Sequence, residues 1–470
     1  MNVTGHGEEG RKLQNEGRTQ KVSVEPRGYA GAPDRGKIAE NNVANTDGQT
    51  DRLMEKILNR ENLNTAYKKV KAKKGTRGVD GMQVDELLSY LKQHGGEITQ
   101  QLREGKYKPN PVRRVEIPKE EKGEFRKLGI PTVVDRVFQQ AIAQELTPIF
   151  EPKFHEWSYG FRPGRGAHDA LKQVCQNVNE GYVYVVDMDL EKFFDTVNQS
   201  KLTEVLSRTI KDGSVISLIS KYQRAGVMEN GMFAQTDVGV AQGGNLSPLL
   251  SNVMLNELDW ELARRGHRFV RYADDLMIFC KSRRAAERTL DHIIPYVEEK
   301  LFLKVNRKKT AVANISKVKF LGYGFYRYKG ECRLRVHPKS VGKMKVKIRQ
   351  LTSRSNGWGN EYRAVKLTQF IRGWVNYFKL ADMKQLLKGV DEWLRRKIRA
   401  IYWKQWKKVK TRYRMISKFG LPEWKVHELA NCRKGIWRAT LMLNSVLTKE
   451  TIVSQGFISM TDYYLKVRVN

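Results

Sequence analysis

Cysteine and long hydrophobic runs are both scarce in this chain, and each shortage excludes a class of protein. Only four cysteines occur in 470 residues, far apart in the sequence and without a C-x-x-C pair. This scarcity argues against a zinc site and a disulfide framework, and it fits a protein of the reducing cytoplasm. No apolar run comes near the roughly 18 residues that a membrane helix needs, and we expect no signal peptide.

Acidic residues are also few relative to basic ones. The chain has 86 Lys+Arg against 51 Asp+Glu, which gives a formal net charge of +35. Such an excess indicates a polyanionic partner, with nucleic acid as the leading candidate. A membrane surface is the alternative, but the basic residues are spread along the chain rather than gathered in one juxtamembrane patch.

Residues 269–280, FVRYADDLMIFC, have the pattern of a β-hairpin with two carboxylates at its tip. Apolar runs flank the tetrad that contains Asp274 and Asp275. Charges at the ends of buried strands are costly unless they are paired or hold a cation, and adjacent carboxylates repel each other. A divalent ion is therefore a natural partner. An acidic turn exposed to solvent is the alternative, and it is what an isolated pair of aspartates usually is.

A second acidic site follows the β-branched and aromatic run at 182–186, YVYVV, which predicts a buried strand. Asp187 and Asp189 come at its end and share one face of an extended strand, so either can meet the hairpin carboxylates. Local physics does not choose between them. Two metal ions about 3.5–4 Å apart can activate an attacking 3′-hydroxyl and stabilise the leaving oxygen of a phosphoryl transfer. Together the two acidic sites favour a polymerase.

Three further segments are candidates for nucleic-acid contact beside the acidic motifs. For the two loops among them a structural turn is the alternative, and without the carboxylates it would be preferred. In SYGFRPGR, residues 158–165, Gly and Pro fix a loop from which Arg162 and Arg165 can reach phosphate or a base. QGGNLSP, residues 242–248, is a second such loop before an apolar helix over 249–258. No acidic residue occurs over 395–412, where the aromatic residues are expected in the core. The basic contacts expected there are Arg395, Arg396, Arg399, Lys404, Lys407 and Lys408.

Composition and periodicity also divide the chain. Residues 1–50 predict a disordered leader, and amphipathic helices are expected from residue 51. Strands are expected over 115–118 and 128–131, joined by a charged loop, and again over 303–310 and 319–324. From about Pro338 the sequence becomes helical and strongly basic.

With these residues in hand, the chain from about residue 51 onward closely resembles bacterial group II intron-encoded proteins, which are reverse transcriptases with a maturase domain. Residues 126–139 are similar to the first fingers block of the family, and SYGFRPGR to the second. DLEKFFD at 189–195 is similar to motif A, QGGNLSP to motif B, YADD to motif C, and 306–310 to motif D. FLGYGF at 320–325 resembles the following palm block, and IRGWVNYF at 371–378 the maturase signature.

The resemblance implies a right-hand polymerase, with α/β fingers and palm around a mainly antiparallel sheet, followed by an α-helical thumb or maturase domain. The implied boundaries are 51–180 for the fingers and 181–335 for the palm, with the reverse transcriptase domain over about 98–326. The maturase or thumb helices would occupy 336–412, and a basic DNA- or RNA-binding region 413–470. The leader over 1–50 has no counterpart in the family.

The same resemblance assigns catalytic roles. It selects Asp189 over Asp187, so that Asp189 and Asp274 would bind two Mg²⁺ ions. Asp275 would support them, and the Leu190 carbonyl would be an additional ligand. Lys309 would protonate the pyrophosphate leaving group.

Nucleotide-binding roles follow in the same way. Phe194 would contact the sugar, where its ring would collide with a 2′-hydroxyl and so favour deoxynucleotides. Gln242 would line the nucleotide pocket, and Arg126 and Lys127 would neutralise the triphosphate.

The implied function is RNA-directed DNA synthesis combined with maturase activity, in support of intron splicing and retrohoming. The expected partners are group II intron RNA, an RNA template with a DNA primer or DNA target, and dNTPs. One alternative is an RNA-binding maturase that no longer polymerises, against which the three clustered carboxylates speak. Another is a reverse transcriptase adopted by its host for defence or repair.

Two departures from the family pattern stand out. Ala241 precedes Gln242 where the family usually has proline, and the loss of that rigid φ is expected to loosen the nucleotide pocket. The chain also ends soon after the maturase helices, without a Cys-paired HNH nuclease domain. We therefore expect a lineage without the endonuclease, such as the bacterial class C type, and no second-strand cleavage.

Overall fold

The computed structural model describes residues 52–118, 123, 125–236, 238–239 and 242–469. The predicted leader over 1–50, most of the charged loop after residue 118, and Ala241 lie outside the described residues.

A four-stranded sheet carries both acidic motifs. Its order is β6-β7-β3-β8, and every pairing in it is antiparallel. Tyr272 pairs with Asp275, which confirms the predicted hairpin and leaves Ala273 and Asp274 as its two-residue turn. The strands are β3 (Tyr184–Met188), β6 (Arg268–Tyr272), β7 (Asp275–Cys280) and β8 (Ala311–Asn314).

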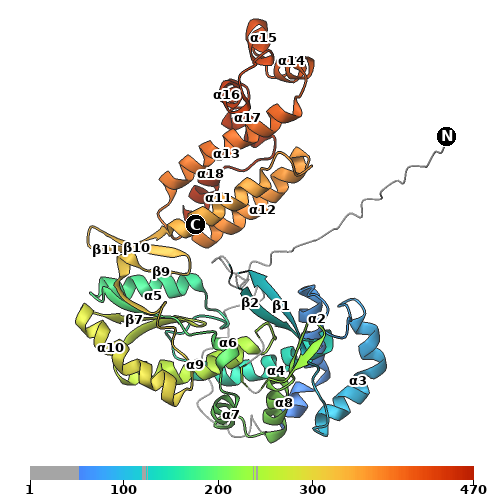
Figure 1. The fold of residues 1–470 in the computed structure, drawn as a ribbon, viewed down its shortest axis with the longest axis vertical. Coiled ribbons are helices and arrows are strands. Elements are labelled where there is room, and N and C mark those ends of the chain that lie inside the picture. The colour runs from blue at the N-terminus through green and yellow to red at the C-terminus, as the bar shows by residue number, and fades with distance from the viewer. Residues whose placement is uncertain (1–51, 119–122, 124, 237, 240–241, 470) are drawn as a thin grey trace, which may run out of the picture. The chain divides into compact units, whose positions relative to one another are not determined.

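Helices cover both faces of this sheet. Helix α5 (Ala167–Asn179) packs on one face, and α10 (Arg283–Pro295) packs on the other together with α9 (Ser247–Arg264) (Figure 1). Successive side chains of a strand point to opposite faces. Val185 accordingly joins the core that contains α5, whereas Val186 joins the core under α9 and α10. The central strand is buried on both sides, as its continuous apolar run predicted.

A second sheet has the order β2-β1-β4-β5 and joins residues from both sides of the predicted boundary at 180. Its strands are β1 (Val112–Pro118), β2 (Phe125–Ile130), β4 (Val227–Glu229) and β5 (Met232–Ala234). Strand β1 pairs antiparallel with β2 and parallel with β4. The helices around the two sheets include α1 (Leu53–Ile57), α2 (Arg60–Ala72), α3 (Leu87–Arg103), α4 (Val133–Phe150), α6 (Phe193–Thr196), α7 (Gln199–Ser207) and α8 (Gly213–Gln223).

Two predicted strands are corrected by the structure. Residues 303–310 form no regular strand: Val305 makes an isolated bridge to Leu190, and a turn follows in which the Asn306 carbonyl accepts from the amides of Lys309 and Thr310. Residues 319–324 are divided at Leu321, whose φ is 49°, into β9 (Lys319–Phe320) and the start of β10 (Tyr323–Tyr328). Strand β10 pairs with β11 (Glu331–Val336).

From Pro338 onward the described chain is helical, as predicted. Tyr402 and Trp406 are buried, which confirms that the aromatic stripe of the basic segment is core. The helices are α11 (Pro338–Leu351), α12 (Asn360–Phe378), α13 (Lys384–Gln405), α14 (Val409–Ser417), α15 (Glu423–Ala430), α16 (Ile436–Met442), α17 (Lys449–Ser454) and α18 (Met460–Val469). No helix in the described ranges combines the length and apolarity that crossing a membrane requires.

Candidate active site

Four carboxylates gather where β3 ends and the β6–β7 hairpin turns. Asp187 lies within β3, and Asp189 follows that strand by one residue. Asp187 pairs with Met277, so by strand alternation Asp187 and Asp275 fall on the α5 face of the sheet. Asp274 occupies the hairpin turn beside them.

Burial, and secondly the charge of neighbouring carboxylates, raises the pKa values of Asp187, Asp274 and Asp275. Loss of solvent contact is the main reason that the pKa of Asp274 is raised, and the charge of Asp189 adds to it. Desolvation by the surrounding protein, together with the charges of Asp274, Asp187 and Asp189, raises the pKa of Asp275 to about 7. Part of the Asp275 residue is nevertheless exposed to solvent. Burial, together with the charge of Asp189, raises the pKa of Asp187 to about 6. Negative charge is therefore crowded at this point of the sheet.

Asp189 is held by the turn that replaces the expected strand. The side-chain amide of Asn306 donates to its Oδ2 at 2.8 Å, and the Thr310 hydroxyl accepts from its backbone N–H at 3.2 Å. The backbone N–H of Asn306 also donates to the Asp189 carbonyl at 2.9 Å. The bridge between Leu190 and Val305 uses the carbonyl of Asp189 and the N–H of Glu191, and so does not use the Leu190 carbonyl. Sequence reasoning assigned no role to Asn306 and Thr310, although short polar side chains in a turn are the usual signal for such contacts.

The oxygen atoms at this turn suit a divalent cation, although their arrangement does not enclose one. Within the described ranges, no three acidic, histidine or cysteine side chains stand ready to enclose a metal ion. The available donors are carboxylate and carbonyl oxygens, which magnesium prefers. Burial is the main cause of the raised pKa values of Asp274, Asp275 and Asp187, and the charge of Asp189 adds to each of them. A cation would relieve this repulsion.

This electrostatic arrangement predicts a pH-dependent effect of magnesium on stability. Carboxyls whose pKa is raised on folding stabilise the fold below their unfolded pKa of about 4 and lose that contribution as the pH rises through about 6 and 7. Because a cation favours the ionised forms, the rise in melting temperature caused by MgCl₂ should grow between pH 5.5 and pH 8, roughly the span of these titrations. Thermal unfolding with and without MgCl₂ measures it. An equal rise at both pH values in the parent chain would contradict the electrostatic account.

A buried arginine fixes the hairpin turn. The Arg271 guanidinium, fully buried, donates to both carboxylate oxygens of Asp259 on α9, at 2.5–3.0 Å. Its Nη1 donates to Asn252 Oδ1 and to the Ala273 carbonyl, each at 2.9 Å. Ala273 has a φ of 58°, in the left-handed region that alanine rarely adopts. The clamp therefore restrains a strained residue immediately before Asp274.

The loop at 158–165 packs against the same turn. Asn252 Nδ2 donates to the Gly160 carbonyl at 2.8 Å, and the Tyr159 amide donates to the Arg271 carbonyl at 2.9 Å. A Cβ at Gly160 would lie 2.2 Å from the Ala273 amide nitrogen, so glycine is required there. This loop supports the catalytic turn through its backbone.

The structure separates the two basic residues predicted to bind triphosphate. Arg126 and Lys127 are neighbours on β2 and so lie on opposite faces. Arg126 is exposed, and its charge acts on Asp274. Lys127 instead lies 3.4 Å from Glu229 and 3.9 Å from Glu116 on the other face. The role of Lys127 in binding the triphosphate stays a prediction, and the structure shows its amino group beside these two carboxylates.

The remaining predicted nucleotide residues lie in short segments next to these elements. The Gln242 carbonyl accepts from the Gly129 amide at 2.7 Å, which ties its loop to β2. Phe194 lies in α6, half-buried, with its ring at 76° to that of Phe193. Lys309 is exposed in the turn that holds Asp189.

Two of the predicted nucleic-acid contacts are also corrected. Arg162 is buried, and its guanidinium donates to Glu151 and to the carbonyls of His155 and Ser158. Arg399 is buried as well, and its Nε donates to the Leu447 carbonyl at 2.9 Å. Both arginines therefore hold protein segments together. Their burial could not be read from charge and composition.

The other predicted basic contacts retain solvent access. Arg165 is half-buried, stacks over Tyr159 and donates to the Glu156 carbonyl. Those on or just after α13 are Arg395 and Arg396, half-buried, and Lys404, Lys407 and Lys408, exposed.

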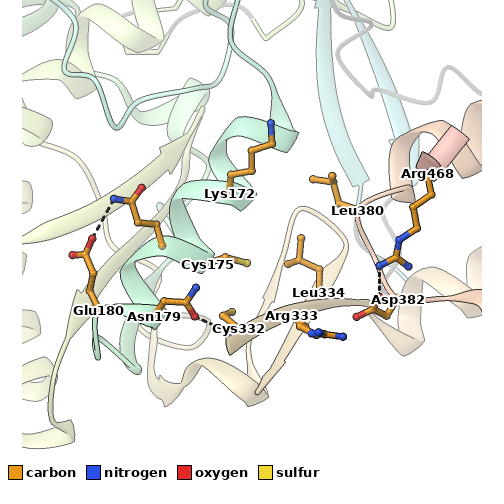
Figure 2. Close-up of a pocket in the computed structure, with 11 residues that line it drawn as sticks. Lys172, Cys175, Asn179, Glu180, Cys332, Arg333, Leu334, Leu380, Asp382 and Arg468 are labelled. Carbon is orange, nitrogen blue, oxygen red and sulfur yellow. Dashed lines mark hydrogen bonds and ion pairs between the residues drawn. The ribbon is translucent and has the colours of Figure 1, made fainter. Parts of the chain in front are cut away.

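A cavity of about 680 Å³ lies apart from the carboxylates (Figure 2). It is lined by α5, β11 and the segments around Leu380 and Arg468. Cys175 and Cys332, far apart in the sequence, both line it, and a hydrogen bond between their thiols raises the pKa of Cys175 and lowers that of Cys332. Asn179 Oδ1 accepts from the Cys332 amide at 2.7 Å and fixes this junction. Cys280 is buried core, as predicted.

Comparison with known families matches two consecutive parts of the chain. Residues 117–325 match the family model described as reverse transcriptase (RNA-dependent DNA polymerase). Residues 341–420 match the model described as group II intron, maturase-specific domain. The first match contains both acidic motifs, and the second contains α12, α13 and α14 and most of α11.

Similar proteins extend over much of the same region. Protein YkfC of Escherichia coli K12 is 33% identical over 327 residues, which cover 60% of this chain and 86% of YkfC. The group II intron-encoded protein LtrA of Lactococcus lactis subsp. cremoris is 29% identical over 352 residues, 61% of this chain and 58% of LtrA. Among solved structures, a chain of a partial Cas6-RT-Cas1–Cas2 complex aligns over 53% of this chain and 43% of that chain, with 22% identity and a TM-score of 0.34.

Proposed function

The chain belongs to the group II intron reverse transcriptases with a maturase domain, and we propose that it synthesises DNA on an RNA template by two-metal nucleotidyl transfer while supporting the splicing and retrohoming of a group II intron. The observation that carries the proposal is the set of crowded carboxylates at the hairpin turn, in the part of the chain that matches the polymerase family. Its partners would be the intron RNA, an RNA template with a DNA primer or DNA target, and dNTPs.

The residues act as follows in this proposal. Asp189, Asp274 and the Leu190 carbonyl would hold two Mg²⁺ ions, with Asp275 in support. When bound, the ions would lower the pKa of the primer 3′-hydroxyl and neutralise the leaving pyrophosphate. Asn306 and Thr310 keep Asp189 oriented, and Arg271 keeps the turn before Asp274 in place.

Substrate binding would use the residues around this centre. Arg126 would bind the triphosphate, because it lies on the face of β2 from which its charge reaches Asp274. Gln242 would line the nucleotide pocket, and Lys309 would protonate the leaving group. The helices from α11 to α13 would act as the thumb that grips the template and primer.

Phe194 would exclude ribonucleotides by collision of its ring with a 2′-hydroxyl. We predict that Phe194→Ala raises the efficiency of rNTP relative to dNTP incorporation by roughly 10- to 100-fold, the effect of removing a small steric conflict from a pocket. Single-nucleotide incorporation kinetics measure it. Tyr328→Ala, which removes an exposed ring at the end of β10, is the control. An unchanged ratio in the Phe194 variant would remove this residue from the sugar site.

The polymerase proposal is tested by primer extension with the purified protein. An RNA template, a DNA primer, dNTPs and MgCl₂ should give full-length DNA, and chelation of the metal should stop it. An alternative outcome is tight binding of structured intron RNA without extension by the parent protein. That result would favour a maturase whose polymerase site has fallen out of use.

A further inference from the structure

Four cations gather around two tryptophan rings where α11, α13 and α16 meet. Lys397 Nζ lies 4.9 Å from the centroid of the Trp437 ring, and the guanidinium carbons of Arg354 and Arg396 each lie 5.7 Å from it. Arg349 and Lys397 each lie 5.7 Å from the centroid of the Trp393 ring. We call these four cations and the two rings the Trp437 cluster.

The cluster lacks carboxylates. Across the described ranges, none of its four cations is within ion-pair distance of an acidic side chain, whereas many other surface cations are paired. Burial and the charges of Arg349 and Arg354 lower the pKa of Lys397, which shows that the cations act on one another. Arg396 Nη2 donates to the Trp437 carbonyl at 3.2 Å, and its buried Nε has no hydrogen-bond partner among the residues that the structure describes. The positive charge is therefore concentrated but not compensated.

Tryptophan rings explain how such a cluster can exist. The face of an indole attracts a cation through its quadrupole without cancelling the cation's charge. The rings thus collect the side chains while leaving their donors open to an anion. Lys404, which donates to the Arg354 carbonyl at 2.9 Å, adds a further charge beside them. Trp437 itself is 44% exposed, so the cluster faces solvent.

We propose that the Trp437 cluster binds the phosphate backbone of an RNA strand. Guanidinium groups present paired donors that match phosphate oxygens. Four cations spread over two rings fit successive phosphates better than one isolated ion, and the exposed face of Trp437 offers a surface for an unpaired base. The site lies outside the carboxylate centre. Through it, the C-terminal helices would hold RNA by contacts between cationic side chains and phosphate groups. The inference rests on the proposed function for its choice of RNA.

The salt dependence of RNA binding tests this site. In the variant Arg396→Gln, the slope of log K against log salt for an unstructured RNA oligonucleotide should become shallower by about 0.7, the loss of one single-strand phosphate contact. Lys397→Gln should give the same change. Lys388→Gln, which removes one exposed charge from the same helix, is the matched control and should leave the slope unchanged. Equal changes in all three variants would overturn the site, because only bulk charge would then matter.

Two additional measurements are needed. One distinguishes RNA phosphate from free phosphate as the bound anion, and the other distinguishes failure of this site from failure of the proposed polymerase. Inorganic phosphate at constant ionic strength should displace RNA only weakly. Strong displacement, with an unchanged slope in Arg396→Gln, would mean that the cluster holds free phosphate and not RNA. Primer extension is measured in the parent chain alone, as a separate test of the polymerase. Absence of extension in the parent chain would count against the proposed polymerase and leave the binding result standing.

Discussion

Asp274→Asn should reduce primer extension at least about a thousandfold, because loss of a metal-binding carboxylate removes several kcal/mol of transition-state stabilisation. Asp274 lies in the two-residue turn of the hairpin and interacts with the charge of Asp189. Replacing the carboxylate by a carboxamide keeps the size of the side chain while removing its charge. Single-turnover extension on an RNA template is the measurement, with the folded state checked by thermal unfolding.

Two comparisons sharpen that experiment. Asp291→Asn, on the exposed surface of α10, makes the same chemical change away from the turn and should leave extension unchanged. Asp187→Asn should retain activity within about tenfold of the parent, because Asp187 lies inside β3, before the proposed ligand Asp189, and its charge acts on the supporting carboxylate Asp275. If Asp187→Asn were inactive and Asp274→Asn active, the metal assignment would be reversed.

The parts of the fold that sequence predicted are those whose signal is local. The hairpin at 269–280 was predictable because apolar runs on both sides of a polar tetrad leave little choice of structure. The segment at 303–310 was misread as a strand because its alternating residues look extended. In the structure, Asn306 and Thr310 use their polar groups to hold Asp189, and that long-range contact overrides the local pattern.

In the candidate site too, the features with a local sequence signal were predicted and those that depend on tertiary contacts were not. The acidic residues were found from their position after apolar strands, but the roles of basic residues depend on contacts that sequence does not show. Arg399 is held by Leu447, 48 residues later in the chain, and Arg162 is held by the folded segment just before it, from Glu151 to Ser158. Lys127 differs from Arg126 only by strand alternation, which places it beside Glu229. Composition predicted that the chain binds a polyanion, yet the cation cluster around Trp437 became visible only once α11, α13 and α16 were packed together.

Arg271→Met should lower both the stability of the protein and its apparent affinity for magnesium. Removing one partner of a buried ion pair typically costs about 3–5 kcal/mol of folding free energy, because Asp259 would remain buried and uncompensated. The double variant Arg271→Met/Asp259→Leu removes both charges, so its stability should be much closer to that of the parent. Both variants lose the hydrogen bond to the Ala273 carbonyl.

The double variant therefore separates folding from positioning. If Arg271 positions the turn, kcat should fall by roughly 100-fold, as expected for a misplacement of about 1 Å at a reacting centre, and the MgCl₂ concentration for half-maximal rate should rise. Arg363→Met is the matched control, since Arg363 is buried in α12 and donates to Asn356 and Asn360 away from the turn. It should destabilise the protein without changing the magnesium dependence. A double variant that is stable and has the magnesium profile of the parent would show that Arg271 serves the fold alone, and that the left-handed Ala273 is held by the remaining packing of the loop at 158–165.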